Sequence, residues 1–355
     1  MRSKLLIGLV LVLAAAVPAA LAYDALYAFG DSLTDTGREP AEPYFHYNGR
    51  WSNGPLWVEY LSVRLGFPYN PDNNLAHSGA QTDDTFGQVR DFVPTTDVGQ
   101  SLFVVWAGGN DFLQEYDTHW FDDDSWDRQI AYSVGNLSNA VVSLYAKGAR
   151  FILVPNTVDV TDITALNWLP GFLRDYLRGK VQQFNRQLAE ALDQIRLAYP
   201  ALTLAGFDIY GQVKLILSDA SAYGFTETHT DALSDVTLLD KSFDGPGANY
   251  VFWDPIHPTT KSHGIIADWY YAVVAPWSAQ AQSQSLQGPR LGLITSNGTV
   301  RVTLGNLQAG QVYTVQASTD LVTWAHVATV DAANATQEWT EPANDSARVF
   351  FRLKF

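Results

Sequence analysis

The sequence predicts an α/β protein, with a parallel sheet between two layers of helices, followed by a small antiparallel β-sandwich. Up to about residue 277, short apolar segments alternate with longer helical ones; after residue 289, short alternating segments are separated by Asn, Gly and Asp turns. The length of 355 residues also exceeds the roughly 250 to 300 residues that a single core usually serves. With 47% hydrophobic and 17% charged residues, the chain can bury a sizeable core.

The first 22 residues have the pattern of a signal peptide. Arg2 and Lys4 precede an uninterrupted apolar run that ends in Ala-Leu-Ala at positions 20–22, a small-residue pattern typical of a cleavage site. We therefore expect cleavage after Ala22 and a secreted or periplasmic mature protein without an integral membrane segment. Because the run is nearly long enough to span a bilayer, an uncleaved membrane anchor is the alternative.

Residues 23–277 are expected to form the first domain. Four continuous apolar runs predict buried parallel strands, at Ala25–Phe29, Ser101–Trp106, Phe151–Pro155 and Leu202–Phe207. Apolar residues at helical spacing predict core-facing helices between and after them, at Ile130–Lys147, Leu173–Tyr199 and Thr259–Val273. This order of elements is the reason for expecting helices on both faces of the sheet.

Residues 278–288, SAQAQSQSLQG, are a polar stretch without apolar periodicity, and we expect them to link two domains. The alternating segments of residues 289–355 predict the small β-sandwich. The phrases YTVQASTDLVTW and FFRL resemble small β-domains at the C-termini of many secreted bacterial proteins. Attachment to a surface or polymer is a role that such a domain can have, and the resemblance implies no activity.

Charge and composition exclude several partners and cofactors. A net charge of −15 repels phosphate backbones, which argues against nucleic acid as a partner. The chain has no cysteine, so neither a disulfide nor a lipid-modified cysteine is available. The scattered histidines lack partners at metal-ligand spacing, and the acidic run at positions 122–124 lacks the glycine and terminal Glu of a Ca²⁺ loop. We expect neither a metal nor an organic cofactor.

Ser32 is the candidate nucleophile. It lies in FGDSLTDTG directly after the first expected strand, and side chains at the carboxyl ends of parallel strands face the crevice where ligands bind. Gly30 and Gly37 permit tight turns there. A serine after an aspartate is also a common turn or cap residue.

The segment WDPIHPTT supplies a candidate base. Asp254 and His257 lie three residues apart, and Pro255 and Pro258 restrict the backbone between and after them. A serine hydroxyl is a poor nucleophile until a base takes its proton, and a carboxylate can orient an imidazole for that task. The alternative is a proline-rich turn with Asp254 as the cap of the helix that follows.

Two further segments fit an oxyanion hole. Asn110 follows the apolar strand FVVWA and places an amide donor at the same edge of the sheet as Ser32. Gly79 lies in the small-residue loop NLAHSGAQT, where a backbone N–H can approach a ligand closely. Either segment can equally be an ordinary turn.

These blocks together resemble the GDSL family of the SGNH hydrolase superfamily, from about Tyr23 to Val274, and GRWSNGPLWVEYLSVRLG is similar to its plant-type lipase and phospholipase-like branch. The resemblance implies a flavodoxin-like three-layer α/β/α fold and an esterase or lipase that cleaves carboxylic esters through an acyl-enzyme. It makes Ser32 the nucleophile, His257 the base and Asp254 its partner. The oxyanion hole would comprise the backbone N–H groups of Ser32 and Gly79 and the amide of Asn110.

Two departures from the branch are visible, and the substrate stays open. Ser78 stands where the branch often has glycine, and the branch's cysteines are absent. The aromatic residues Phe112, Tyr116 and Trp120 are candidates for a substrate pocket, although they can equally pack a loop onto the core. The resemblance favours a lipid-like or other small ester; the alternatives are a glycan O-acetylesterase of the same superfamily and a non-catalytic surface-binding protein.

Overall fold

The computed structural model describes residues 23–40, 46–118, 121–287, 290–296, 299–305, 307, 311–318, 323–331, 337–342 and 350–354. The expected signal peptide lies outside these residues. The chain divides into two compact units, Met1–Ala279 and Gln280–Phe355. Within the described parts of the chain, no helix combines the length and the apolar character needed to cross a bilayer.

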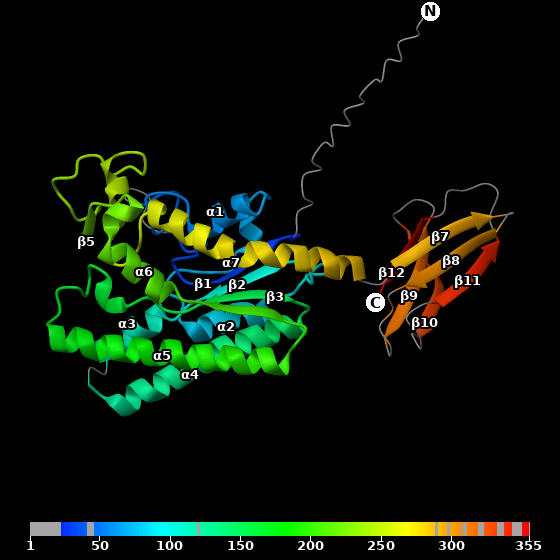
Figure 1. The fold of residues 1–355 in the computed structure, drawn as a ribbon, viewed down its shortest axis with the longest axis horizontal. Coiled ribbons are helices and arrows are strands. Elements are labelled where there is room, and N and C mark those ends of the chain that lie inside the picture. The colour runs from blue at the N-terminus through cyan, green and yellow to red at the C-terminus, as the bar shows by residue number, and fades with distance from the viewer. Residues whose placement is uncertain are drawn as a thin grey trace, which may run out of the picture. The chain divides into compact units, whose positions relative to one another are not determined.

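The first unit is built on a four-stranded parallel sheet (Figure 1). Its strands hydrogen-bond in the order of the chain: β1 (Leu26–Gly30), β2 (Leu102–Trp106), β3 (Phe151–Pro155) and β4 (Thr203–Phe207). Every residue of β2 and β3 is buried, because these inner strands are covered on both faces. Each strand lies within one residue of its expected position, and the parallel α/β architecture is confirmed.

Helices cover both faces of this sheet. On one face lie α2 (Thr82–Asp91), α4 (Asp123–Ala146) and α5 (Gly171–Ala198), and on the other lie α1 (Trp57–Arg64) and α7 (Thr260–Gln287) (Figure 1). The shorter α3 (Gly109–Thr118) follows β2, and α6 (Ile209–Ser218) follows β4. The helix α7 continues beyond the expected end at Val273, so the backbone of residues 278–287, expected to be a linker, is helical.

Packing of the apolar helix faces explains why these segments are helical. In α5 the buried positions Leu177, Val181, Phe184 and Leu188 recur at spacings of three or four residues and join the core on their side of the sheet. Burying each such side chain contributes roughly 1.5 to 3 kcal/mol. On the other face the rings of Trp57 and Tyr270 meet edge to face, with centroids 5.1 Å apart.

Short elements complete the edge of the first unit near the functional loops. β5 (Glu227–Asp231) and β6 (Tyr250–Phe252) form a separate two-stranded parallel sheet. The 3-10 turns span Pro71–Asn73, Val160–Asp162, Ala220–Tyr223 and Pro246–Asn249. The chain leaves β6 directly into the segment that carries Asp254 and His257.

The described residues of the second unit comprise the end of α7 and two three-stranded antiparallel sheets, ordered β10-β9-β12 and β11-β8-β7. Their strands are β7 (Arg290–Ser296), β8 (Thr299–Gly305), β9 (Val312–Ser318), β10 (Ala325–Asp331), β11 (Gln337–Pro342) and β12 (Phe350–Lys354). A small core joins the two sheets, with Leu304 from β8 beside Tyr313 and Val315 from β9. This is the small antiparallel β-domain that the sequence predicts.

Candidate active site

Ser32 lies on the turn that ends β1. Gly30, the last strand residue, has a φ of +153°, and a Cβ there would stand 2.1 Å from the carbonyl oxygen of Trp106 on the neighbouring strand. Glycine is therefore needed for this close approach. The turn is closed by the N–H groups of Thr34 and Asp35, which donate to the carbonyl oxygen of Asp31 at 3.0 and 2.9 Å. Ser32 is 8% exposed at the carboxyl end of the strand.

His257 is held on a tight loop between β6 and α7. The N–H of Trp253 donates to the carbonyl oxygen of His257 at 2.7 Å. Within this loop the Oδ1 atom of Asp254 accepts the backbone N–H groups of Ile256 at 2.9 Å and His257 at 2.7 Å. The two residues expected to act together are thus fixed by one short segment.

The structure brings Ser32, His257 and Asp254 into a continuous line of hydrogen bonds. Nδ1 of His257 lies 2.8 Å from Oδ2 of Asp254, and Nε2 of His257 lies 2.8 Å from Oγ of Ser32. An ionised carboxylate only accepts hydrogen bonds, so the histidine proton lies on Nδ1 and Nε2 is free to accept the serine hydroxyl. This is the geometry of a nucleophile, a base and an orienting carboxylate.

Three buried ionisable groups at the site have shifted pKa values, and the cause differs between them. Burial by itself would raise the pKa of Asp254, but hydrogen bonds from His257 and His46 outweigh it and hold this pKa well below its usual range. Burial raises the pKa of Asp31 to about 6. For His263, burial and the nearby His257 lower the pKa to about 3, so its imidazole is neutral at physiological pH.

The two expected oxyanion residues lie at neighbouring places, Asn110 in the first turn of α3 and Gly79 in the loop before α2. The Asn110 amide donates to the carbonyl oxygen of Ala80 at 2.9 Å, and Asn110 lines the same cavity as Ser32. Gly79 has a φ of +77° and no atom within 4 Å of where a Cβ would lie. Its loop is anchored beside the serine turn, because the N–H of Ser78 donates to Oδ2 of Asp35 at 2.9 Å. Gly79 is not among the cavity's lining residues.

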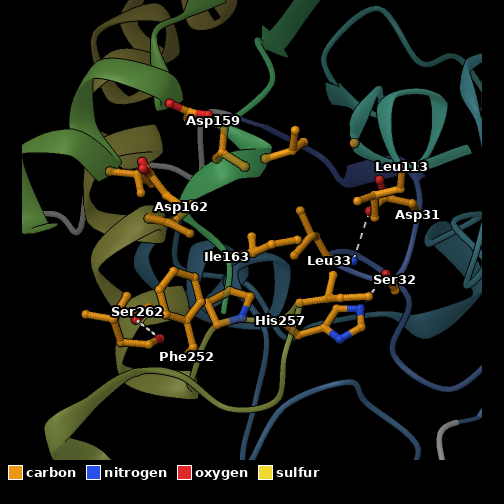
Figure 2. A pocket seen from close by; sticks show the side chains of 18 of the residues that line it. Asp31, Ser32, Leu33, Leu113, Asp159, Asp162, Ile163, Phe252, His257 and Ser262 are labelled. Carbon is orange, nitrogen blue, oxygen red and sulfur yellow. Dashed lines mark hydrogen bonds between the residues drawn. The ribbon is translucent and has the colours of Figure 1, made fainter. Parts of the chain in front are cut away.

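An apolar cavity of about 90 Å³ opens beside Ser32 and His257. Figure 2 shows these two residues on one side of it and Asp159 and Asp162 on the opposite side. The wall between them is mostly aliphatic and aromatic and includes Leu113, Val158, Val160, Ile163, Val213, Ile216, Val251, Phe252, Ile256 and Ile266. Such a cavity can hold the apolar part of a small molecule next to the serine.

The acidic side of the cavity is neutralised by two cations. Oδ2 of Asp159 lies 2.7 Å from Nε of Arg178 and 2.6 Å from Nζ of Lys214. Lys214 also reaches Oδ2 of Asp162, at 2.6 Å. Burial opposes ionisation of Asp159, but the hydrogen bonds from Lys214, Thr161 and Arg178 lower its pKa. These carboxylates are therefore part of a local ion-pair network.

Two of the three aromatic residues expected to line a substrate pocket, Phe112 and Tyr116, do not line this cavity. Phe112 and Tyr116 are buried in the hydrophobic core, where the ring of Phe112 stacks on Trp126 with centroids 5.5 Å apart. The substrate-pocket interpretation is wrong for these two residues and the packing alternative holds, since both belong to the core and Phe112 also meets Phe184 of α5, with ring centroids 5.6 Å apart. Trp120 lies outside the described residues.

The sequence pattern did not predict several residues that lie at the site. Residues 158–163 follow the expected strand at Phe151–Pro155, so the same strand-end argument that located Ser32 would have located them. His46 and Trp51 had no detectable signal. The ring of Trp51 lies over His257, with centroids 5.1 Å apart and an interplanar angle of 30°, while His46 approaches Asp254 from 208 positions away in the sequence.

Comparison with known proteins places the chain in a family. The sequence model of the GDSL-like Lipase/Acylhydrolase family matches residues 26–270. GDSL esterase/lipase APG of Arabidopsis thaliana is 25% identical over 68% of this chain and 88% of its own length. The phosphatidylcholine-sterol acyltransferase of Aeromonas hydrophila is 24% identical over 74% of this chain and 93% of its own.

Among solved structures, an acetylxylan esterase from Geobacillus stearothermophilus superposes with a TM-score of 0.41 at 18% identity, covering 70% of this chain and 92% of its own. The family match covers the whole parallel sheet and both loops of the serine–histidine pair. The chain therefore belongs to the GDSL-like lipase/acylhydrolase family of the SGNH superfamily and is a carboxylic ester hydrolase.

Proposed function

We propose that this ester hydrolase works through an acyl-enzyme on Ser32, with His257 as general base and Asp254 as its orienting partner. The observation that carries the proposal is the pair of 2.8 Å contacts that His257 makes, one to Oγ of Ser32 and one to Oδ2 of Asp254. A nucleophile and base within about 2.6 to 3.2 Å, with the base held by a third group, is the arrangement that activates a serine.

In the proposed reaction, Oγ of Ser32 attacks the ester carbonyl carbon while Nε2 of His257 takes the hydroxyl proton. The tetrahedral intermediate collapses, the C–O bond to the alcohol breaks, and His257 returns the proton to the leaving oxygen. Water then attacks the acyl-enzyme with His257 again as base, which releases the acid and restores Ser32. General-base assistance of this kind contributes roughly 10² to 10⁴ in rate.

We assign three hydrogen-bond donors to the negative oxygen of each tetrahedral intermediate. These are the backbone N–H groups of Ser32 and Gly79 and the side-chain amide of Asn110. One N–H of that amide is directed at Ala80, and its second N–H is available for the oxyanion in the cavity that Asn110 shares with Ser32. Each such donor is worth roughly 10² to 10³ in kcat.

The lining of the cavity supports an ester with an apolar acyl or alkyl group. Twelve aliphatic or aromatic side chains surround the space beside Ser32, whereas Asp159 and Asp162 are engaged in ion pairs on the opposite side. Transfer of apolar surface from water into such a space contributes roughly 25 cal/mol per Å². A glycan O-acetylesterase would place only an acetyl group there and would gain little from this lining.

The same proposal includes export and domain roles. Residues 1–22 serve as a signal peptide cleaved after Ala22, with Arg2 and Lys4 as its charged start. Residues 23–277 form the hydrolase domain and residues 278–288 connect it to the β-domain of residues 289–355. That C-terminal domain attaches the enzyme to a surface or polymer, and takes no part in the chemistry.

One experiment tests both the nucleophile and the substrate class. Wild-type protein and Ser32→Ala are treated with a p-nitrophenyl phosphonate, digested and analysed by mass spectrometry, and aryl esters of two to sixteen carbons are assayed beside an acetylated glycan. We expect a single phosphonylated residue, Ser32, and a kcat/KM that rises from acetyl to longer acyl chains. Labelling that persists in Ser32→Ala refutes the nucleophile, and faster turnover of the acetylated glycan than of every aryl ester refutes the substrate class.

A further inference from the structure

A second histidine contacts the carboxylate that orients His257. Nε2 of His46 lies 3.4 Å from Oδ2 of Asp254, and both side chains are only 7% exposed. His46 comes from the segment before α1, which is far from Asp254 in the sequence. Nothing in the reaction proposed above uses this residue.

The two oxygens of Asp254 share one partner and differ in the others. Nδ1 of His257 lies 2.9 Å from Oδ1 and 2.8 Å from Oδ2. Oδ1 also accepts two backbone N–H groups of its own loop, those of Ile256 and His257. Oδ2 is approached only by imidazole nitrogens in the described contacts, Nδ1 of His257 at 2.8 Å and Nε2 of His46 at 3.4 Å. Because the carboxylate can only accept, Nε2 of His46 carries a proton in this contact.

This arrangement of hydrogen-bond donors around Asp254 gives His46 a specific role. Rotation of a carboxylate about its Cβ–Cγ bond is soft, with broad minima. The carboxylate is planar and rigid, so this rotation moves both oxygens together, and a donor to either oxygen resists it. The two backbone donors and His257 all belong to the short loop that carries Asp254, so they hold the carboxylate and the imidazole only relative to that loop. Rotation of the two side chains together would carry Nε2 of His257 away from Ser32. A second donor from a different part of the chain resists that rotation.

Aromatic rings hold His46 in place. Its ring centroid lies 4.9 Å from that of Trp51 and 6.3 Å from that of Trp253, both in edge-to-face geometry. Trp51 also lies over the His257 ring. One tryptophan thus touches both imidazoles that donate to Asp254, and these contacts restrict the position of both rings.

We propose that His46 is a positioning residue, which holds the Asp254 carboxylate so that His257 keeps Nε2 directed at Ser32. The inference rests on the proposed roles of Ser32, His257 and Asp254. His46 acts on the reacting atoms only through Asp254. Loss of the His46 side chain therefore lowers the rate of the chemical steps without changing the binding of the ester.

Two substitutions separate positioning from packing. His46→Phe keeps an aromatic ring between Trp51 and Trp253 but removes the donor, whereas His46→Gln keeps an N–H donor of similar reach but removes the ring. If His46 positions Asp254, His46→Gln is the more active of the two variants. If His46 only fills space between the rings, His46→Phe is the more active one. His326→Phe is the matched control, because His326 is an exposed histidine of the C-terminal unit bonded to Thr329.

Kinetics on one aryl ester and the rate of Ser32 phosphonylation are measured for each variant, together with Tm. We expect His46→Phe to lower kcat about tenfold, as for a lost hydrogen bond to a charged group, with KM within about twofold of wild type. His46→Gln should stay within about threefold of the wild-type kcat, and phosphonylation rates should follow the same order.

The inference is overturned by a wild-type kcat in His46→Phe, by a lower kcat for His46→Gln than for His46→Phe, or by a change confined to KM. If only His46→Gln folds, a loss in its kcat beyond about tenfold also overturns it. Failure of the proposed function looks different, because wild-type protein itself would then turn over no ester and would carry no phosphonate on Ser32.

Discussion

Nε2 of His257 lies 2.8 Å from Oγ of Ser32, although the two residues are 225 positions apart in the chain. Ser32 is carried by the turn after β1 and His257 by the loop between β6 and α7. That loop is fixed to the rest of the first unit by several hydrogen bonds, among them those from the N–H of Thr260 to Oδ1 of Asn53 at 2.9 Å and from the N–H of Thr259 to the carbonyl oxygen of Val251 at 2.9 Å. The contact therefore depends on two rigid supports.

Replacing Asp254 by Asn should lower kcat/KM by roughly 10³ to 10⁴, because the amide no longer fixes the proton on Nδ1 of His257. The fold should persist, since an Asn side-chain oxygen can still accept the backbone N–H groups of Ile256 and His257. The matched control is Asp268→Asn: Asp268 is 64% exposed and pairs with Arg64 on the surface. Ester turnover and circular dichroism check both variants, and near-wild-type rates for Asp254→Asn would require a different orienting carboxylate.

Replacing Asn110 by Ala should lower kcat by about 10² to 10³, or roughly 2.7 to 4 kcal/mol, and leave KM almost unchanged. The physical reason is that the amide would bind charge that develops only in the transition state. Steady-state kinetics with a saturable aryl ester give both parameters. Because Asn110 also ties down Ala80, Tm must be compared, and an effect on KM alone would make the amide a ground-state contact.

Filling the cavity should shorten the acyl chain that the enzyme accepts. Val213 on α6 lines the cavity and is partly buried, so Val213→Phe places a larger ring in that space. We expect kcat/KM for a long-chain ester to fall at least about tenfold, comparable to the loss of about 1.4 kcal/mol of apolar contact, with the acetyl ester changed by less than about twofold. Leu215→Phe, on the same helix but 52% exposed, is the control. An equal loss of kcat/KM for the long-chain and the acetyl ester would show that the acyl chain binds outside this cavity.

Asp31 should make stability depend on pH. Burial raises its pKa to about 6 in the folded protein, whereas an unfolded chain releases the same proton near pH 3.9. The folded state therefore binds more protons between these values, and its stability falls as pH rises through that window. Asp31→Asn, which keeps an acceptor for the N–H of Leu33, should be about 2 to 3 kcal/mol more stable than wild type at pH 8 and equal at pH 4.

Urea unfolding at the two pH values measures this difference directly. The comparison between pH values matters, because a packing effect of the substitution would appear equally at both. Equal free energies of unfolding for the two proteins at pH 8 would show that Asp31 ionises without cost, and the buried carboxyl would then need a partner beyond its contact with Leu33.

Removing the C-terminal unit should leave the chemistry intact. The proposed catalytic residues and the cavity lie in the unit Met1–Ala279, which contains its own core. Protein that ends at Gln287 keeps all of α7 and should hydrolyse a short aryl ester within about twofold of the full-length rate, since nothing in the active site is lost. Kinetics on one short and one long ester, with circular dichroism, check this. A folded truncation that loses most kcat/KM on the short ester would couple the β-domain to catalysis.

Local sequence pattern was sufficient for the main elements of the fold. The runs that became β1, β2 and β3 are almost wholly buried, because a strand covered on both faces has no polar side to interrupt it. The fourth run became the edge strand β4, where only Leu204 is buried, so the expectation of a buried strand was wrong there. The spacing of Val181, Phe184 and Leu188 predicted α5 for a similar reason, since one face of the helix meets the core. The end of α7 was less predictable, because residues 278–287 have no apolar periodicity and still continue the helix.

For the site, the sequence by itself singled out the residues that we propose for the chemistry, because Ser32 follows a parallel strand and Asp254 and His257 share one short proline-bounded loop. Only the tertiary structure decided what surrounds them. It turned Phe112 into the core and placed His46 against Asp254. Such contacts depend on how loops from distant parts of the chain pack together. Neither helical nor strand periodicity in the sequence predicts which loops will come into contact.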